Sequence, residues 1–303
     1  MGYMILPEHW GKGHGTSIAA RLIIQAQAAG IAVLYAVIDP SNAASRQILL
    51  RQNFVSTWVG DYEGLPGEIL ELNLQEAVFF NVGKEPTGDD YDSMIKLELV
   101  EPGIPFNPLI NAGAITVSSL IGGDCKEEKS RRILEFFRTL ANNDRLDYNE
   151  AVYRSEWETG HLNRSLGYFL KHNGVLKDDV EDVLAVYFRH CSIEVTCADL
   201  ARMALVLAYD GTDPITGNEL IPRRYVQIAK TFMTTCGMYN ASGEFAIQVG
   251  LPAKSGVSGG ILTLVPGQFG IGLVGPALNR KGNSIAGVHL LERLSKEFDW
   301  SLF

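Results

Sequence analysis

Hydrophobic and polar positions divide the chain into two regions with different periodicity. In the first region, segments with apolar residues at helical spacing alternate with short apolar runs of strand type. The predicted elements are helices at 15–29 and 41–52 and strands at 31–38, 54–62 and 68–74. Gly64, Pro66 and Gly67 are expected to separate the last two strands. This alternation is typical of an α/β segment.

The second region, from about Glu76, is dominated by amphipathic helices. We expect helices at 111–121, 127–141, 148–173, 177–190, 197–209, 221–235 and 284–297 and strands at 261–265 and 270–274. A turn through Pro266 and Gly267 would join the two strands. Helices followed by a small sheet predict α+β packing. The change in pattern predicts two domains, residues 1–74 and 75–303.

The composition is that of a soluble globular protein, since 46% of the 303 residues are hydrophobic and 20% are charged. A net charge of -9 argues against nonspecific binding to nucleic acid or an anionic membrane. The sequence has no apolar run of about 20 residues to span a membrane, and its start lacks the pattern of a signal peptide. We therefore expect a cytoplasmic protein without metal or cofactor, whose dispersed cysteines are reduced and buried: Cys125, Cys191, Cys197 and Cys236.

A glycine-rich segment, Trp10 to Thr16, follows a short strand-like piece and opens the first predicted helix. Backbone N–H groups at such a helix start can hold a pyrophosphate, although a tight structural turn is the alternative. With the segments 2–8, 39–46 and 52–54, it resembles the second half of a GNAT-type N-acetyltransferase over residues 2–74.

That resemblance implies acetyl-CoA binding, with the pyrophosphate held by Lys12, Gly13 and Gly15 and the pantetheine arm by Asn42. The sequence departs from the family at two positions. Trp10 replaces the basic residue or glutamine that starts the loop. Leu49 lies near the position where the family often has a tyrosine that serves as general acid. The half of the domain that builds the acceptor site is also missing. Acetyl transfer and CoA binding without transfer are the alternative functions for this segment.

The segment 155–164 carries polar groups suited to an amino-acid ligand. Glu156 and Asn163 are seven positions apart, which in one helix of about 3.6 residues per turn places both on the same face. A carboxylate can bind an ammonium group, and an amide can donate to a carboxylate. The same spacing is common among solvated surface pairs, so it identifies no site by itself.

Five segments share their wording, order and approximate spacing with bacterial glutaminases. They are Glu-Pro-Thr-Gly at 85–88, Phe-Asn-Pro-Leu-Ile-Asn-Ala-Gly-Ala at 106–114, Ser-Glu-Trp-Glu-Thr at 155–159, Cys-Gly-Met-Tyr-Asn-Ala-Ser-Gly at 236–243 and Pro-Ala-Lys-Ser-Gly-Val-Ser-Gly-Gly at 252–260. The resemblance covers about residues 76–303. It implies an α+β fold like that of serine β-lactamases and transpeptidases, mostly helical with a small antiparallel sheet and preceded here by a partial α/β GNAT-like segment.

The glutaminase resemblance implies hydrolysis of L-glutamine to L-glutamate and ammonia through a serine acyl-enzyme, by a homo-oligomer. Substrate-binding residues would be Asn111, Glu156, Asn163, Tyr187, Tyr239 and Val257. Tyr239 would lie at the reacting amide, and Val257 would give a backbone N–H to the oxyanion. Lys254 would line the site as the lysine of the Lys-Thr-Gly strand does in β-lactamases. Tyr239 and Lys254 are thus the expected catalytic residues.

The nucleophile of that family is missing from the expected place. Glutaminases carry Ser-x-x-Lys upstream of Glu-Pro-Thr-Gly, where this chain is acetyltransferase-like. A Ser-x-x-Lys does occur at Ser93 to Lys96, but it overlaps an alternating, strand-like run from Met94 to Val100. Residues three apart on a strand point to opposite faces, so this pair is not expected to act together. A noncatalytic or chimeric product is therefore the rival hypothesis.

Three further features of the sequence give less information about function. The missing N-terminal strands of the family would leave a sheet edge or apolar face open, unless the acetyltransferase-like strands cover it. Gly270 to Gly275 spells a dinucleotide fingerprint, but no helix follows it, so we expect a strand that packs closely at its glycines. His161 and His190 are isolated, so neither is expected to bind a metal.

Overall fold

The computed structural model describes residues 11–29, 31–62, 64–74, 79, 81–94 and 103–303. Two compact units make up the chain, Met1–Phe80 and Asn81–Phe303, and each is described by itself. The strand-like pieces predicted at 2–8 and 94–100, Trp10 and Lys96 lie wholly or mostly outside the described residues. None of the helices in the described ranges is both long and apolar enough to cross a membrane.

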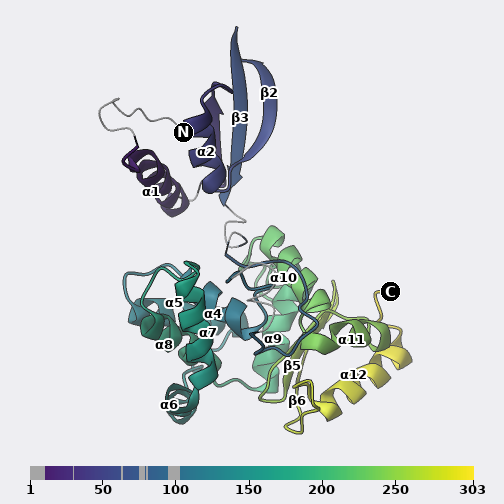
Figure 1. The fold of residues 1–303 in the computed structure, drawn as a ribbon. Coiled ribbons are helices and arrows are strands. Elements are labelled where there is room, and N and C mark those ends of the chain that lie inside the picture. Colours follow the sequence, from purple (N-terminus) through teal and green to yellow (C-terminus); the bar gives the residue numbers. More distant parts are fainter. Residues whose placement is uncertain (1–10, 30, 63, 75–78, 80, 95–102) are drawn as a thin grey trace. The chain divides into compact units, whose positions relative to one another are not determined.

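The first unit is a three-stranded antiparallel sheet with two helices against one face (Figure 1). Its elements are α1 (His14–Ala28), β1 (Val33–Ile38), α2 (Ala43–Arg51), β2 (Val55–Tyr62) and β3 (Leu65–Asn73), and the strand order is β1-β3-β2. Ala36, Phe54 and Leu70 are buried in the core of this unit, while Tyr35 and Val37 on alternate positions of β1 are exposed. Every element predicted here is found with its predicted type.

One detail of the first unit differs from expectation. Only Gly64 lies in the turn between β2 and β3, whereas Pro66 and Gly67 are inside β3, opposite Asp61 and Gly60 of β2. Strand β1 pairs with β3 only from Glu68 onward, so among the described residues no strand pairs with the other side of β3 at Pro66. A proline is tolerated there because its missing N–H would have no strand partner.

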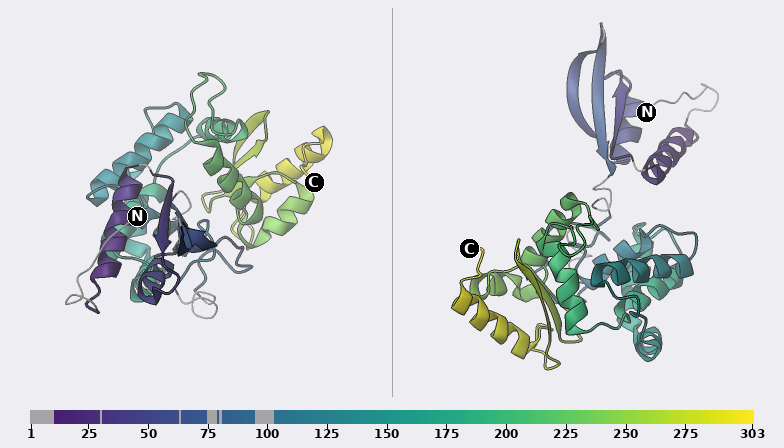
Figure 2. Two further views of the ribbon diagram at one scale, coloured as in Figure 1. Left: turned by 90° about the horizontal axis from the view of Figure 1, so that it is seen from above. Right: turned by 180° about the vertical axis from the view of Figure 1, so that it is seen from behind.

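The second unit places a group of helices beside a small antiparallel sheet with helices packed on it (Figure 2). Its helices are α4 (Asn111–Ser119), α5 (Lys126–Ala141), α6 (Glu150–Thr159), α7 (His161–His172), α8 (Val180–Cys191), α9 (Cys197–Ala208), α10 (Arg223–Thr235), the 3₁₀ turn η3 (Tyr239–Ala241), α11 (Ser242–Gln248) and α12 (Ile285–Phe298). The strands are β4 (Ala253–Ser255), β5 (Gly260–Val265) and β6 (Phe269–Val274), in the order β4-β5-β6.

Helix α9 packs directly on β5 and β6, and glycines make this approach possible. A methyl group at Gly270 or Gly272 would overlap backbone atoms of α9. The expectation of a closely packed strand, and not a dinucleotide turn, is therefore confirmed. The strands of the first unit form a separate sheet, so within the described residues they add no strand to β4-β5-β6.

Two predictions for the second unit were wrong. The single helix expected at 148–173 is two helices, α6 and α7, which meet at Gly160. The short elements η3, α11 and β4 were not predicted, because three to seven residues are too few to show a helical or strand period.

Candidate functional site

The break between α6 and α7 changes how Glu156 and Asn163 are presented. Gly160 has ψ of 45°, so Glu156 is on α6 and Asn163 on α7, and the assumption of one shared helix face was wrong. A methyl group at Gly160 would lie 2.6 Å from the ring of Phe188, which is fully buried on α8. Glycine thus lets both helices pack closely on α8. This packing, and not the helical period, determines where the side chains of Glu156 and Asn163 lie.

Asn111 and Asn163 are in direct contact. The side-chain amide of Asn111, the first residue of α4, donates to Oδ1 of Asn163 at 3.0 Å. The backbone N–H of Asn111 donates to the carbonyl oxygen of Tyr91 at 3.0 Å. Each asparagine is half-buried, so other polar atoms remain for a ligand that carries a carboxylate or an ammonium group.

Buried polar contacts fix the segment that leads into α4. Asn107 is only 1% exposed, donates to the carbonyl of Glu85 at 2.9 Å and accepts from the N–H of Leu109 at 3.0 Å. A methyl group at Gly113 would overlap the carbonyl oxygen of Asn107. Two of the sequence motifs, around Glu85 and Asn107, therefore meet and hold the start of α4 in place.

Helix α8 brings Tyr187 and Cys191 together, one turn apart. Burial, followed by the nearby Cys191 and the charge of Glu156, raises the pKa of Tyr187 well above its ordinary value. Protein surrounds the Cys191 thiol on most sides, and this burial, with a smaller contribution from Glu156, raises its pKa to about 11. Tyr187 is thus within electrostatic reach of Glu156, Cys191 and Tyr239, and both α8 groups stay protonated at neutral pH.

The expectation that all four cysteines are buried was wrong. Cys236 is buried, but Cys125, Cys191 and Cys197 are exposed as whole residues, although protein still surrounds much of the Cys191 sulfur. The reason is their position at helix ends, where the chain turns outward: Cys125 precedes α5, Cys191 ends α8 and Cys197 begins α9. Sequence reasoning did not place Cys191 at the site, and no feature of its local sequence indicated this.

Tyr239 occupies a constrained position in η3. Its φ of 56° is in the left-handed region, which is uncommon for a residue with a side chain. The phenol donates to the carbonyl oxygen of Ser255 at 2.9 Å, and the Nζ of Lys254 lies 4.4 Å from the ring centre. Burial, followed by the neighbouring Tyr91 and Cys191, raises the pKa of Tyr239, so the phenol is a proton donor at neutral pH.

Lys254 on β4 is the basic group beside Tyr239. Its ammonium donates to the carbonyl oxygen of Ser255, and burial lowers its pKa to about 8. Near neutral pH the side chain therefore exists in both protonation states, which suits proton transfer. The hydroxyl of Ser255, 1% exposed, has no hydrogen-bond partner among the described residues.

Val257 is exposed in the turn between β4 and β5. The hydrogen bonds of this turn are donated by the N–H groups of Gly256, to Gly260, and of Gly259, to Gly256, each at 2.9 Å. The N–H of Val257 takes no part in these turn bonds. It is therefore a candidate donor to a ligand oxygen close to Lys254, which precedes it on β4.

The remaining chemical groups lie outside these clusters. The N–H of Ser93 donates to the carbonyl of Asp90 at 3.0 Å, and Lys96 of the same Ser-x-x-Lys lies outside the described residues. His190 contacts Ser118, with Nδ1 and Oγ 3.3 Å apart, and burial lowers its pKa to about 4, so it is neutral at pH 7. No group of three potential metal ligands occurs in the described ranges.

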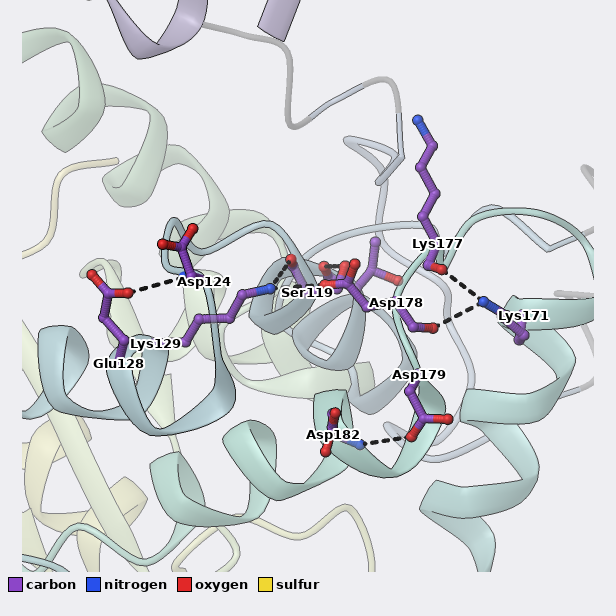
Figure 3. A network of polar contacts seen from close by, with 10 residues as sticks. Ser119, Asp124, Glu128, Lys129, Lys171, Lys177, Asp178, Asp179 and Asp182 are labelled. Carbon is purple, nitrogen blue, oxygen red and sulfur yellow. Dashed lines mark hydrogen bonds and ion pairs between the residues drawn. The ribbon is translucent and has the colours of Figure 1, made fainter.

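A pocket of about 320 Å³ lies elsewhere, where α5 and α8 begin. Figure 3 shows the polar contacts of residues that line it, among them Lys129 and Asp179. Its charged groups are largely paired: Lys129 with Asp178 at 2.8 Å and Lys126 with Asp182 at 2.6 Å. Asp179 accepts the first N–H groups of α8. None of the predicted site residues lines this pocket.

In the first unit, the glycine-rich loop leads into α1. Gly11 and Gly13 have φ of 73° and 78°, and the Gly13 carbonyl accepts from the N–H of Ser17 at 3.1 Å. Lys12 is exposed, whereas Gly15 is buried in the first turn of α1. The Asn42 side chain caps α2 by accepting from the N–H of Ser45 at 3.1 Å. The loop therefore turns through two glycines with positive φ before α1, while Asn42 has a structural partner already.

Two family models match different parts of the chain. The model of the family described as "Glutaminase" matches residues 68–303. The model described as "Acetyltransferase (GNAT) domain" matches residues 1–55.

Relatives over the second unit are numerous and similar. The glutaminase of Geobacillus thermodenitrificans (strain NG80-2) is 56% identical over 229 residues, 76% of this chain and 74% of its own length. The glutaminase of Bacillus cytotoxicus (strain DSM 22905 / CIP 110041 / 391-98 / NVH 391-98) is 48% identical over 274 residues, 90% of this chain and 87% of its own. A crystal structure of Bacillus glutaminase in 4.3 M NaCl superposes with a TM-score of 0.73 and 47% identity, covering 75% of this chain and 77% of that one. The predicted helix-rich, β-lactamase-like α+β fold is thereby confirmed.

Proposed function

The chain belongs to the glutaminase family, and from this premise we propose that its second unit binds L-glutamine as a hydrolase of the side-chain amide. The observation that carries the proposal is the contact between Asn111 and Asn163, which joins two distant motifs at one place. Glu156 would accept the ammonium group of the ligand, while Asn111, Asn163 and Tyr187 would bind beside it. A negative carboxylate and neutral amides are the groups that an amino-acid end requires.

The reacting end would lie at Tyr239, Lys254 and Val257. In the reaction that the family resemblance implies, a serine hydroxyl adds to the amide carbon and passes its proton to a base, while the carbonyl electrons move onto oxygen, which the N–H of Val257 would stabilise. Breaking the C–N bond releases ammonia once the nitrogen receives a proton. The Tyr239 phenol, which stays protonated, and the Lys254 ammonium, with a pKa of about 8, are the available donors. Water then frees glutamate from the acyl intermediate.

We propose in addition that this chain lacks the family's serine nucleophile. The region upstream of Glu-Pro-Thr-Gly is GNAT-like, and the relative from Geobacillus extends beyond the part aligned with this chain. Ser93 lies in a turn and begins the run that the sequence predicts to be a strand, where residues three apart point to opposite faces, so we expect it to be a poor substitute. Binding of glutamine without efficient turnover is the expected behaviour.

Two measurements test this function on the purified chain. Calorimetry should show binding of L-glutamine or L-glutamate that Glu156→Gln weakens at least tenfold, since an ionic contact is lost. The matched control is Glu158→Gln, an exposed carboxylate on the same helix. Equal affinities in the two variants would contradict the assigned ammonium site.

Ammonia release from glutamine tests the missing nucleophile. We expect turnover near the background rate. Turnover that Ser93→Ala abolishes would identify Ser93 as the nucleophile and contradict the proposal. Turnover that survives Ser93→Ala but not Tyr239→Phe would require another nucleophile and also overturn it.

A second candidate function concerns the first unit, residues 1–74 as we delimit it, with the glutaminase domain at 75–303. The positive φ angles of Gly11 and Gly13 before α1 favour a pyrophosphate contact by Lys12, Gly13 and Gly15. A thermal shift with acetyl-CoA but not with glutamine, lost in Lys12→Ala, would support CoA binding. No shift with acetyl-CoA would end this proposal. We also propose a cytoplasmic homo-oligomer, and size-exclusion chromatography with light scattering would test its state.

A further inference from the structure

One residue outside all the predicted site positions touches both ends of the proposed site. Tyr91 packs its ring on that of Tyr239, with ring centres 4.8 Å apart and planes inclined by 39°. Its carbonyl oxygen accepts the N–H of Asn111 at 3.0 Å. The neighbouring Asp90 accepts from the Asn240 amide at 3.1 Å. The chain around Tyr91 is thus tied to the start of α4 and to η3.

The Tyr239 ring is held between two groups. Tyr91 contacts the ring, and Lys254 places its Nζ 4.4 Å from the ring centre. Gly282 packs against the same pair, since a methyl group there would lie 3.1 Å from Cε1 of Tyr91 and 3.5 Å from Cε2 of Tyr239. Because Tyr239 has φ of 56°, its backbone conformation is one that side chains disfavour and that surrounding contacts must maintain.

We propose that Tyr91 is a positioning residue, whose ring holds Tyr239 under the Lys254 amine and whose backbone couples this arrangement to Asn111. The inference rests on the proposed function, because its effect on catalysis passes through Tyr239. The stacked ring of Tyr91, and not its phenol hydroxyl, holds Tyr239 in position. Burial, followed by the charges of Asp92 and Asp90, raises the pKa of Tyr91, so that its phenol stays neutral.

The first test needs no substrate. Competitive labelling of Lys254 with acetic anhydride, read by mass spectrometry across pH, reports how well the ring of Tyr239 shields the amine. In the native chain the midpoint should be near 8, the pKa that burial gives Lys254. Tyr91→Ala should raise it by about one pH unit, because water that reaches the amine favours the ammonium form. Tyr91→Phe, which keeps the ring, should leave it unchanged.

The second test uses kinetics wherever ammonia release is measurable. Tyr91→Ala should lower kcat about fivefold, the loss expected for one aromatic stack, and leave KM for glutamine within about twofold. Tyr91→Phe should restore kcat. Phe298→Ala, which removes a stacked aromatic pair on α12, is the control for general destabilisation.

Gly282→Ala probes the same ring pair from the other side and guards against a Tyr91 variant that fails to fold. It should change the labelling midpoint of Lys254, whereas Gly267→Ala should not. Gly267 has a similar φ, 69° against 82°, but open space around it, so the pair separates backbone strain from displacement of the rings. A folded Tyr91→Ala or Gly282→Ala with the native midpoint overturns the inference.

The two proposals fail in different ways. A native midpoint near the ordinary lysine value of 10.5 overturns the positioning role whether or not glutamine binds. A midpoint near 8 that Tyr91→Ala raises, in a chain that binds neither glutamine nor glutamate, supports the positioning role and sinks the proposed function.

Discussion

Glycines in the motifs of the two units serve different physical purposes. In the first unit, Gly11 and Gly13 adopt positive φ and have nothing within 4 Å of where a side chain would begin. In the second unit, a methyl group at Gly113 or Gly237 would overlap backbone atoms of Asn107 or Ala253. The first pair sets only the local path of the chain, whereas the second pair lets distant segments touch.

This difference explains why the two resemblances carry unequal weight. A glycine needed for a turn recurs in many unrelated loops, so the motif around Gly11 indicates a conformation and little else. A glycine needed for close approach depends on a partner segment, so the motifs around Gly113 and Gly237 indicate tertiary contacts as well. Motifs of this second kind specify a whole fold.

The largest expected effect comes from filling one of the close approaches. Gly113→Ala should lower the free energy of unfolding by about 3 kcal/mol, because the methyl group must displace the Asn107 carbonyl and with it the contact to Glu85. For a unit of this size that lowers Tm by about 6–12 °C. Calorimetric or circular-dichroism melting measures it.

The matched control is Gly174→Ala, which has φ of 76° and nothing within 4 Å. We expect a loss of about 1 kcal/mol, the cost of placing a side chain in the left-handed region. Equal losses in the two variants would mean that backbone conformation, and not close packing, explains the glycines of the second unit.

Lys254 gives the second prediction, of about 2–3 kcal/mol at most. Burial lowers its pKa from 10.5 to about 8, so between these values the unfolded chain binds more protons than the folded one. Stability should therefore rise with pH across this window and be reduced below it. Lys254→Met should remove this rise, measured as urea unfolding at pH 7 and pH 10. If Lys254→Met keeps the native pH dependence of stability, the Lys254 amine is exposed to water and its pKa is not lowered by burial.

The fold could be predicted from sequence wherever a period was long enough to see. Helices α5, α8 and α9 carry continuous apolar faces, and their limits were found to within a few residues. The break at Gly160 was missed because α6 and α7 together read as one helical pattern, and only the packing of Gly160 on Phe188 separates them. Tertiary contact overrode the local pattern there.

The candidate site shows the same limit. Asn111, Glu156, Asn163 and Tyr239 were found through the wording of their motifs, and their assigned roles remain predictions. Tyr91 and Cys191 were not found, because their contacts with Tyr239 and Tyr187 join segments that are far apart in the sequence or that carry no local signal. The sequence of a motif identifies the motif's own residues. The neighbours that hold those residues in place can be identified only from the folded structure.

Helix caps offer a third, smaller comparison between the units. Asn42 accepts one backbone N–H at the start of α2, and Asn149 accepts two, from Ala151 and Val152, at the start of α6. Replacing either by alanine should cost about 1 kcal/mol, with Asn149→Ala the larger. If Asn42 instead serves only a ligand, Asn42→Ala will leave the melting of the free chain unchanged.

The smallest effect is expected at Lys12, and it sharpens the comparison most directly. Lys12 is exposed between two glycines whose surroundings are open, so Lys12→Ala should change the free energy of unfolding by less than about 0.5 kcal/mol. If the loop binds a pyrophosphate, the same change should weaken acetyl-CoA binding about fivefold in low salt, since an exposed ionic contact contributes about 1 kcal/mol. The difference should shrink in 0.5 M salt as screening increases (the screening length falls to about 4 Å). A loop that only turns the chain predicts no change in either measurement, which would leave the first unit with a shape similar to an anion site and no ligand.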